Sequence, residues 1–264
     1  MKSFAEYLLG SLVLSTPILA TPTVKRDTVT HPVFRSRDWV GAALINIAPN
    51  ENYTTAECHF KIPQVKVPKF VPATQSGEWH MATACGLDGD LNQNAFVNTG
   101  VHAIITRDSN GVEATTYTAV ATWFPAPDVP FPIEVHAGDQ ISASVVALST
   151  TTARCTFINW STGKSNQLTI QAAGPDNALD GSSADFVVIR PESDSNKGEF
   201  FDLADWDTVE ITNINAKTQL HDYDLNSAPH SNIINMVNPD TLSPVANASD
   251  PSATTMKATF VQAS

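Results

Sequence analysis

The sequence of 264 residues has few basic side chains and no long apolar run. Its longest run near the start, Leu8 to Leu19, is shorter than the roughly 20 residues that a membrane-spanning helix needs. The 27 Asp and Glu residues outnumber the 15 Lys and Arg residues, so the formal charge is −12. A strongly negative chain is repelled by nucleic acid and by anionic lipid, and we therefore expect neither as a partner.

The sequence also lacks the short motifs of several enzyme classes. It has no CxxC, no HExxH and no Cys/His cluster, so no metal site is expected, and no cofactor is called for. No G-x-S-x-G motif indicates a serine hydrolase. The three cysteines, Cys58, Cys85 and Cys155, all lie in apolar, strand-like segments, which fits either one disulfide with one buried thiol or three packed thiols.

The N-terminus has the features of a targeting segment. A lysine followed by a short apolar run predicts a secretory signal over residues 1–20. The dibasic pair Lys25-Arg26 predicts a short propeptide over residues 21–26, although two ordinary surface cations would look the same. The mature chain is then residues 27–264.

Three N-x-[ST] sequons, at Asn52, Asn159 and Asn247, fit a glycoprotein. With the signal, they predict a secreted, extracellular protein. An acidic secreted chain loses much of its self-repulsion at low pH, where carboxylates are protonated, and this suits an acidic medium.

Alternating polarity and abundant Thr, Val and Pro predict a β protein. The predicted strands are Trp39 to Ile47, Glu57 to Ile62, His80 to Leu87, Ala95 to Thr106, Glu113 to Phe124, Gln140 to Leu148, Arg154 to Asn159, Gln167 to Gln171, Ala184 to Arg190, Thr208 to Asn213 and Met256 to Gln262. Many short strands favour a sandwich or barrel. The polar stretch at about 217–255 is interpreted as a long surface excursion, after which the chain returns to the same single domain.

One loop, GLDGDLNQNAFVNTG, resembles the start of a calcium-binding loop. Oxygen-bearing side chains alternate in it: Asp88, Asp90, Asn92 and Asn94. A calcium loop needs glycine at its sixth place and glutamate at its twelfth, where this chain has Gln93 and Thr99. A polar turn, whose Asp and Asn side chains hydrogen-bond to backbone, is the favoured interpretation.

A more specific resemblance comes from six segments taken in order. GLDGD, AFVNTG, YTAVATWFP, HAGDQI, INWSTGK and SSADFVVI follow one another as in the fungal glutamic peptidases, the eqolisin family. The chain resembles that family over most of its mature length, from Trp39 onward. The resemblance implies an all-β fold, a jelly-roll sandwich of two curved antiparallel sheets of the concanavalin A-like lectin and glucanase type. We expect a monomer.

The resemblance also implies a catalytic pair on the concave sheet. In the family, a glutamate activates water and a glutamine orients it, and these positions fall on Asp185 and Asn98. Both side chains are one methylene, about 1.3 Å, shorter than those of the family. A displacement of about 1 Å can cost roughly a hundredfold in rate.

The same resemblance implies a set of residues that line the substrate cleft: Trp123, Thr122, His102 and Asp88. Thr122 stands where the family has glutamate, and His102 where an acidic residue is common. By strand alternation, His102 points to the same face as Asn98.

Two functions are implied. In the first, the protein is a secreted acid endopeptidase acting on polypeptides, in which Asp185 is general base and then acid while Asn98 orients the water and stabilises the oxyanion. In the second, catalysis has been lost and the concave face binds peptide or glycan.

A third interpretation, carbohydrate chemistry, rests on FDLADWD. There Asp205 and Asp207 would share a strand face beside Asp202 and nearby aromatic residues, as suits sugar hydrolysis. The simpler interpretation of this acidic stretch is a solvated strand edge.

Overall fold

The computed structural model describes residues 31–45, 50–92, 94–192 and 199–261. Within these ranges the regular secondary structure consists of β-strands and one short 3-10 helix at Pro175–Asn177. The predicted signal and propeptide lie outside the described residues.

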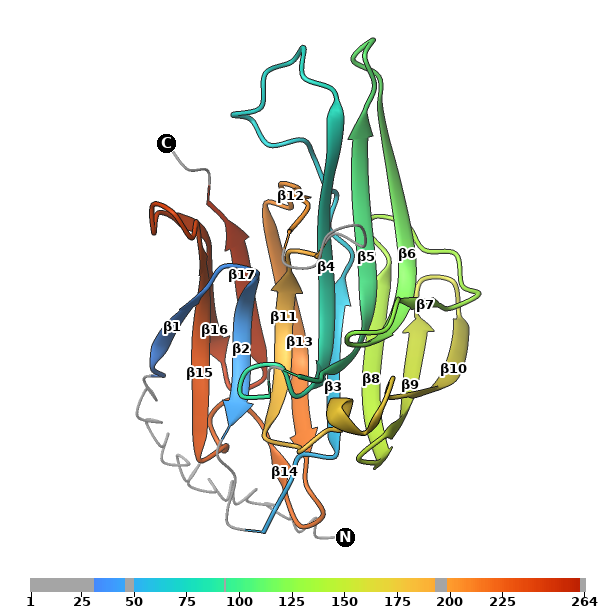
Figure 1. Cartoon of the computed structure of the whole chain (residues 1–264), viewed down its shortest axis with the longest axis vertical. Coiled ribbons are helices and arrows are strands. Elements are labelled where there is room, and N and C mark those ends of the chain that lie inside the picture. Colours follow the sequence, from blue (N-terminus) through green and yellow to red (C-terminus); the bar gives the residue numbers. More distant parts are fainter. Residues whose placement is uncertain (1–30, 46–49, 93, 193–198, 262–264) are drawn as a thin grey trace, which may run out of the picture. The chain divides into compact units, whose positions relative to one another are not determined.

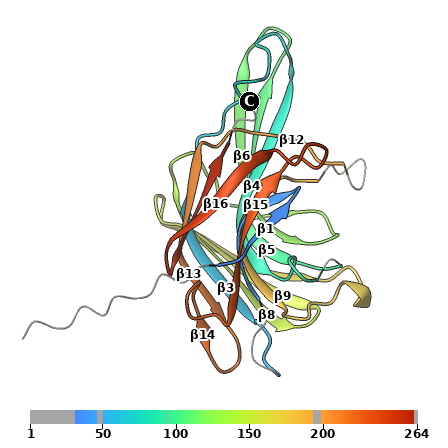
Figure 2. The same ribbon diagram turned by 90° about the vertical axis from the view of Figure 1, so that its left-hand side faces the viewer.

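The strands form two layers (Figures 1 and 2). One layer contains the predicted catalytic pair. Its hydrogen-bonded order is β1 (Val33–Ser36), β15 (His230–Val237), β2 (Trp39–Ile45), β11 (Ser183–Ile189), β4 (Gly77–Leu87), β5 (Val97–Arg107), β6 (Glu113–Trp123) and β7 (Val129–Pro130). The short strand β12 (Asp202–Leu203) runs parallel to the start of β4. Apart from this pair and β1–β15, the neighbours in the layer are antiparallel.

The second layer packs behind the first. Its order is β16 (Pro244–Ser252), β17 (Thr255–Phe260), β13 (Thr208–Lys217), β3 (Thr55–Lys61), β8 (Gln140–Ser149), β9 (Thr152–Asn159) and β10 (Lys164–Gln171), with β14 (Asp222–Tyr223) beside β13. A short β15–β16 pairing joins the two layers at one edge.

The core lies between the layers because each strand turns one face inward. In β11 the inward residues Ala184, Phe186 and Val188 are fully buried. Aromatic side chains from both layers, including Trp79 and Phe157, meet them in one cluster. The intervening residues of β11, including Asp185, therefore face the opposite side of the sheet.

The predicted jelly-roll sandwich of antiparallel sheets is confirmed, and each strand predicted from the sequence is present within a few residues. The structure differs at 217–255, which is not a surface excursion. This segment supplies β15 and β16, and β15 lies between β1 and β2 with Ile233 and Ile234 buried. The sequence HSNIINMV hides this strand because its polar residues Ser231 and Asn232 are also buried.

The three cysteines are free thiols buried in the core, so of the two arrangements considered, three packed thiols is the one present. Cys85 from the first layer donates a hydrogen bond to the Ala143 carbonyl of the second, at 3.2 Å. This contact bridges the layers without a covalent bond.

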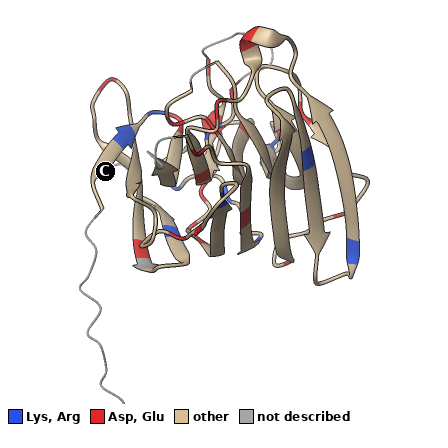
Figure 3. Cartoon of the chain, turned by 90° about the horizontal axis from the view of Figure 1, so that it is seen from below, with Lys and Arg blue, Asp and Glu red and all other residues tan. Residues whose placement is uncertain are grey.

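Asp and Glu residues lie on strands and loops of the described part (Figure 3), and in the sequence of that part they outnumber Lys and Arg. No helix within the described residues is long and apolar enough to cross a membrane.

Candidate active site

The register of three neighbouring strands brings the predicted pair together. Asp185 of β11 pairs with Gly86 of β4, and Gly86 pairs with Asn98 of β5. Directly paired residues point to the same face, so both side chains rise on the side away from the core. Their Cα atoms are separated by two strand spacings, about 9–10 Å.

Gly86 keeps the space between the two side chains open. A Cβ atom at Gly86 would lie 2.3 Å from the Val97 carbonyl oxygen and 2.8 Å from the Asn98 Cβ. No side chain fits there without moving backbone. Because Gly86 has no side chain, β5 can approach β4 closely. For the same reason the space between Asp185 and Asn98 is not filled.

The loop after β4 folds back over Asp185. A Cβ atom at Gly89 would lie 3.2 Å from the Asp185 Oδ2 atom. Asp185 is only 5% exposed, and Asn98 is 9% exposed. The site is thus formed by a sheet floor and a loop that covers its β11 side.

The Asp185 carboxyl is poorly compensated. The Ser183 hydroxyl donates to Oδ2 at 3.2 Å, while Oδ1 is buried without a hydrogen-bond partner among the described residues. Burial raises the pKa of Asp185 well above its usual value, and the charges of Asp90 and Asp88 raise it further. Within the described residues Oδ1 is thus a buried oxygen without a hydrogen bond, which disfavours the charged carboxylate.

Asp88 differs from its expected role at the substrate cleft. Its carboxylate accepts backbone N–H groups of Asp180 at 2.9 Å and of Ser182 at 2.8 Å, and it is 2% exposed. Burial, followed by the nearby Asp180 charge, raises the pKa of Asp88 to about 6. Asp88 therefore fixes the loop that leads into β11, and it acts on the site through this loop and through its charge near Asp185.

The rest of the loop behaves as a polar turn. The Asn92 side-chain oxygen accepts the backbone N–H groups of Asn94 and Ala95, at 3.1 and 3.3 Å. These side-chain-to-backbone bonds are those of the favoured interpretation. Among the described residues no group of three or more metal-ligating side chains is arranged to hold a metal ion.

Trp123 was expected in the cleft, and the structure places it elsewhere. Strand alternation turns Trp123 into the core, where it is 2% exposed and donates its indole N–H to the Asn177 carbonyl at 3.0 Å. Its neighbour Thr122 does face the site, because it pairs directly with Asn98.

Sequence reasoning missed Asp128, whose carboxylate accepts a hydrogen bond from the Thr122 hydroxyl. Asp128 follows the turn after β6 and is 41% exposed. Strand alternation does not predict the position of Asp128, because Asp128 lies outside β6. The path of the turn after β6 brings its side chain to the sheet face. It places a carboxylate at Thr122, the residue that pairs with Asn98 and that stands where the resemblance puts the family's glutamate.

His102 lies on the same face as Asn98, as predicted, but four residues further along β5, or about 13 Å. Its Nε2 atom is 3.1 Å from His80 Nδ1, and its Nδ1 atom is 3.9 Å from an Asp128 oxygen. His80 in turn stacks on Phe201 at 3.7 Å. His102 thus belongs to a second polar cluster, which Asp128 links to the Asn98 end of the site.

The acidic stretch FDLADWD does not form the paired carboxylates of a sugar hydrolase. Asp205 forms an isolated β-bridge with Lys66, Asp207 lies outside the strands, and the Asp205 side chain accepts the Asp207 backbone N–H at 2.8 Å. Trp206 between them points inward and is 1% exposed.

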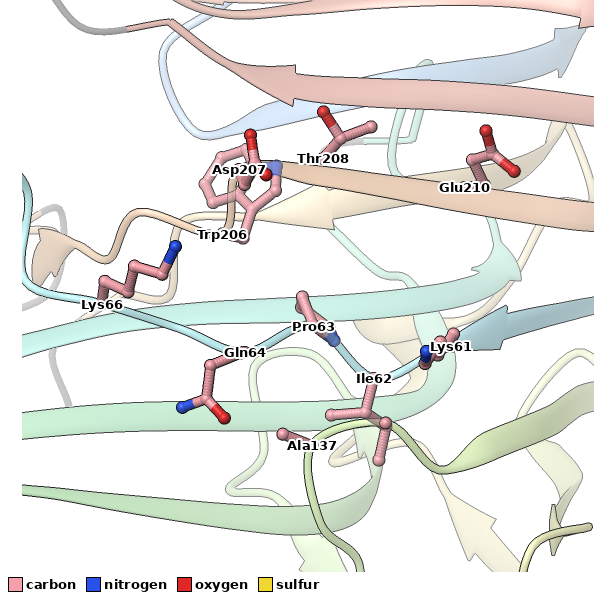
Figure 4. A pocket seen from close by; sticks show the side chains of 11 residues that line it. Lys61, Ile62, Pro63, Gln64, Lys66, Ala137, Trp206, Asp207, Thr208 and Glu210 are labelled. Atoms are coloured by element: carbon pink, nitrogen blue, oxygen red, sulfur yellow. The ribbon is translucent and has the colours of Figure 1, made fainter.

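Asp207 instead lines a surface pocket of about 550 Å³ with Lys66 and Glu210 (Figure 4). This pocket shares no residue with the Asp185 site.

Comparison with known proteins supplies an independent line of evidence. The model of the peptidase A4 family matches residues 37–258. Aspergillopepsin-2 of Aspergillus niger is 28% identical over 194 residues, which are 69% of this chain and 64% of that protein. The chain thus spans slightly less than two thirds of the length of this curated relative.

Two solved structures share the fold. Scytalido-glutamic peptidase with a transition state analog inhibitor has a TM-score of 0.68 and 24% identity, over 85% of this chain and 98% of that chain. Aspergilloglutamic peptidase from Aspergillus niger has a TM-score of 0.58 and 24% identity, over 69% of this chain and 99% of that chain.

The substitution Gly86→Ala is expected to destabilise the fold by about 1–3 kcal/mol, since its methyl group would overlap backbone. Urea unfolding would measure the change, with Gly174→Ala as the matched control because a Cβ at Gly174 meets nothing within 4 Å. Equal stability of the two variants would show that β4 and β5 can separate at this point.

Asp185→Asn is expected to stabilise the protein at pH 7. Because the folded-state pKa of Asp185 is raised, its contribution to stability is full below about pH 3.9 and is lost as pH rises through the folded-state pKa. The neutral Asn side chain avoids this loss of stability. The loss is about 1.4 kcal/mol for each unit by which the folded-state pKa exceeds the unfolded-state pKa.

Thermal and urea unfolding at pH 3.5 and pH 7 would test this difference against the exposed control Asp240→Asn. Wild type and Asp185→Asn should be alike at the lower pH. A variant that is less stable than wild type at pH 7 would mean that the folded protein favours the ionised carboxylate.

Proposed function

Because the chain belongs to the peptidase A4 family, we propose that it is a secreted acid endopeptidase of the glutamic-peptidase type, which hydrolyses peptide bonds with a carboxylate-activated water. The observation that carries this proposal is the placement of Asp185 and Asn98 on either side of Gly86, on one face of the sheet. The substrate is a polypeptide, and the protein acts as a monomer.

The proposed reaction begins when ionised Asp185 takes a proton from a water as that water attacks the peptide carbonyl carbon. The Asn98 amide N–H groups hydrogen-bond to the oxygen on which negative charge develops. Asp185, now protonated, gives the proton to the leaving nitrogen, and the carbon–nitrogen bond breaks. The products are a carboxylic acid and an amine, and Asp185 is ionised again.

Burial supports this role for Asp185 while restricting its pH range. A carboxylate with a raised pKa is a stronger base once ionised, but it is protonated over more of the acid range. We therefore expect kcat/KM to rise with pH through the folded-state pKa of Asp185, and not near pH 3.9 as for an exposed aspartate.

The alternative proposal is a family member that binds peptide or glycan without cleaving it. The observation in its favour is that both side chains of the pair are a methylene shorter than those of the family, across strands whose spacing is fixed by main-chain hydrogen bonds. A water held by one side chain could then lie beyond reach of the other.

Secretion with N-glycosylation is also part of the proposal. Asn52 and Asn247 are exposed, and both could carry a glycan in the folded protein. Asn159 is fully buried, its amide donates to Asp139 at 2.8 Å, and its oxygen accepts the Ser161 backbone N–H at 3.0 Å. A glycan on Asn159 would require these bonds to break.

The mature chain is expected to cleave an acid-denatured protein in a scan from about pH 2 to pH 7. Asp185→Ala should abolish cleavage, and Asn98→Ala should lower kcat about 10²- to 10³-fold through loss of oxyanion stabilisation. Asp240→Asn, an exposed residue between β15 and β16, should leave the rate unchanged.

Failure of wild type to exceed Asp185→Ala at any pH would favour the binding protein. The double substitution Asp185→Glu with Asn98→Gln then separates two causes. Activity gained by this variant would identify side-chain length as the missing element, whereas none would point to other differences in the cleft.

Glycopeptide mass spectrometry of the protein secreted from a eukaryotic host is expected to find glycans at Asn52 and Asn247 and unmodified Asn159. Enzymatic removal of N-glycans should shift the mass of wild type but not that of an Asn52→Gln, Asn247→Gln variant. A glycan on Asn159 in folded, secreted protein would contradict the proposal.

A further inference from the structure

A second carboxyl group lies beside Asp185 without belonging to the sheet. Asp90 is carried by the loop that folds back over β11, one residue after Gly89, which lies against the Asp185 carboxyl. The Asp90 charge raises the pKa of the Asp185 carboxyl, second only to burial. The two acids are therefore neighbours in space although they come from separate parts of the chain.

The sheet provides an anchor for Asp90. Asn232 of β15 pairs with Ala43 of β2, and Ala43 pairs with Asp185, so the three residues form one row on the same face. The Asn232 amide donates to the Asp90 Oδ2 atom at 3.4 Å. Ala43 offers only a methyl group between Asn232 and Asp185, which leaves room for a side chain from the loop above it.

Across this face of the sheet, an amide, two carboxyls and a second amide therefore follow one another in space: Asn232, Asp90 from the loop, Asp185 and Asn98. The first amide holds the loop carboxyl, and the second faces the sheet carboxyl across Gly86.

The groups that face this pair are acidic or neutral. Asp88 adds a further negative charge near Asp185 when it is ionised, and the Ser183 hydroxyl donates to Asp185. The Asp185 charge also raises the pKa of the buried Tyr53 hydroxyl. No ion pair within the described residues brings Lys, Arg or His to either member of the pair. Two such carboxyls repel each other when both are ionised, so the ionisation of one makes the ionisation of the other harder.

We propose that Asp90 is a positioning residue for Asp185, that the two carboxyls share one proton over the acid pH range, and that Asn232 anchors Asp90 for this purpose. The consequence for catalysis rests on the proposed function, whereas the shared titration does not. The ionised Asp90 makes proton release from Asp185 harder, so Asp185 keeps its proton to a higher pH than burial alone would give.

The titration can be measured without any activity. The stability difference between wild type and Asp185→Asn is followed by urea unfolding from pH 3 to pH 8, and again in an Asp90→Asn background. With Asp90 replaced, the pH above which the difference stops growing should move down by about one unit, because one like charge has been removed. In an Asp240→Asn background it should not move.

Unchanged titration of Asp185 in the Asp90→Asn background would overturn the proposal. If Asp90→Asn does not fold, Asn232→Ala replaces it, because that variant keeps both carboxyls and removes only the anchor. It should lower the same upper pH limit by a smaller amount, and an unchanged limit would again reject the pairing.

Kinetics provide the second readout. In Asp90→Asn the acid limb of the kcat/KM profile should move to lower pH by about the same one unit, and Asp90→Glu should restore it. A fall in rate with an unmoved pH profile would mean that Asp90 is only structural.

If no variant cleaves peptide, the proposed function fails. The unfolding experiment still decides whether the pair exists.

Discussion

The close packing of β4 against β5 at Gly86 is the constraint on which the site depends. Because the Val97 carbonyl occupies the place where a side chain would begin, β4 must pass that point as bare backbone. The same ladder fixes the level of β5, and on its other side β4 fixes β11. Asp185 and Asn98 thus face one another across a gap that main-chain hydrogen bonds set, and neither residue determines the gap itself.

The catalytic role proposed for Asp185 and the stability of the fold make opposite demands on this position. Asp185 is buried, has one oxygen without a partner, and lies near two other acids, all of which disfavour its charge. A fold selected for stability alone would place an apolar residue there. Asp88 offsets part of this cost because its carboxylate accepts backbone N–H groups of the loop before β11 and so fixes that loop. The site is therefore held by its surroundings, and low pH relieves its repulsion.

The sequence predicted the fold well because alternation records which face of a strand is buried. It failed at β15, where Asn232 is buried for a polar contact instead of being exposed, so that the pattern is broken. It placed Trp123 in the cleft because the motif around it resembles the family, although alternation alone turns its side chain away from Asn98. Asp128 carried no signal, since its place depends on the path of a turn.

The sequence by itself determined the β architecture and the family, since these follow from local periodicity and from ordered motifs, and it predicted the pair Asp185 and Asn98. Only the tertiary structure decided which acids surround Asp185. Asp88, Asp90 and Asp185 look alike in the sequence, as polar residues beside glycine or serine. Their roles differ because one accepts backbone N–H groups, one is held by an amide from a distant strand, and one is left with an unpaired oxygen. Such environments arise from contacts between segments roughly a hundred residues apart, which no local pattern encodes.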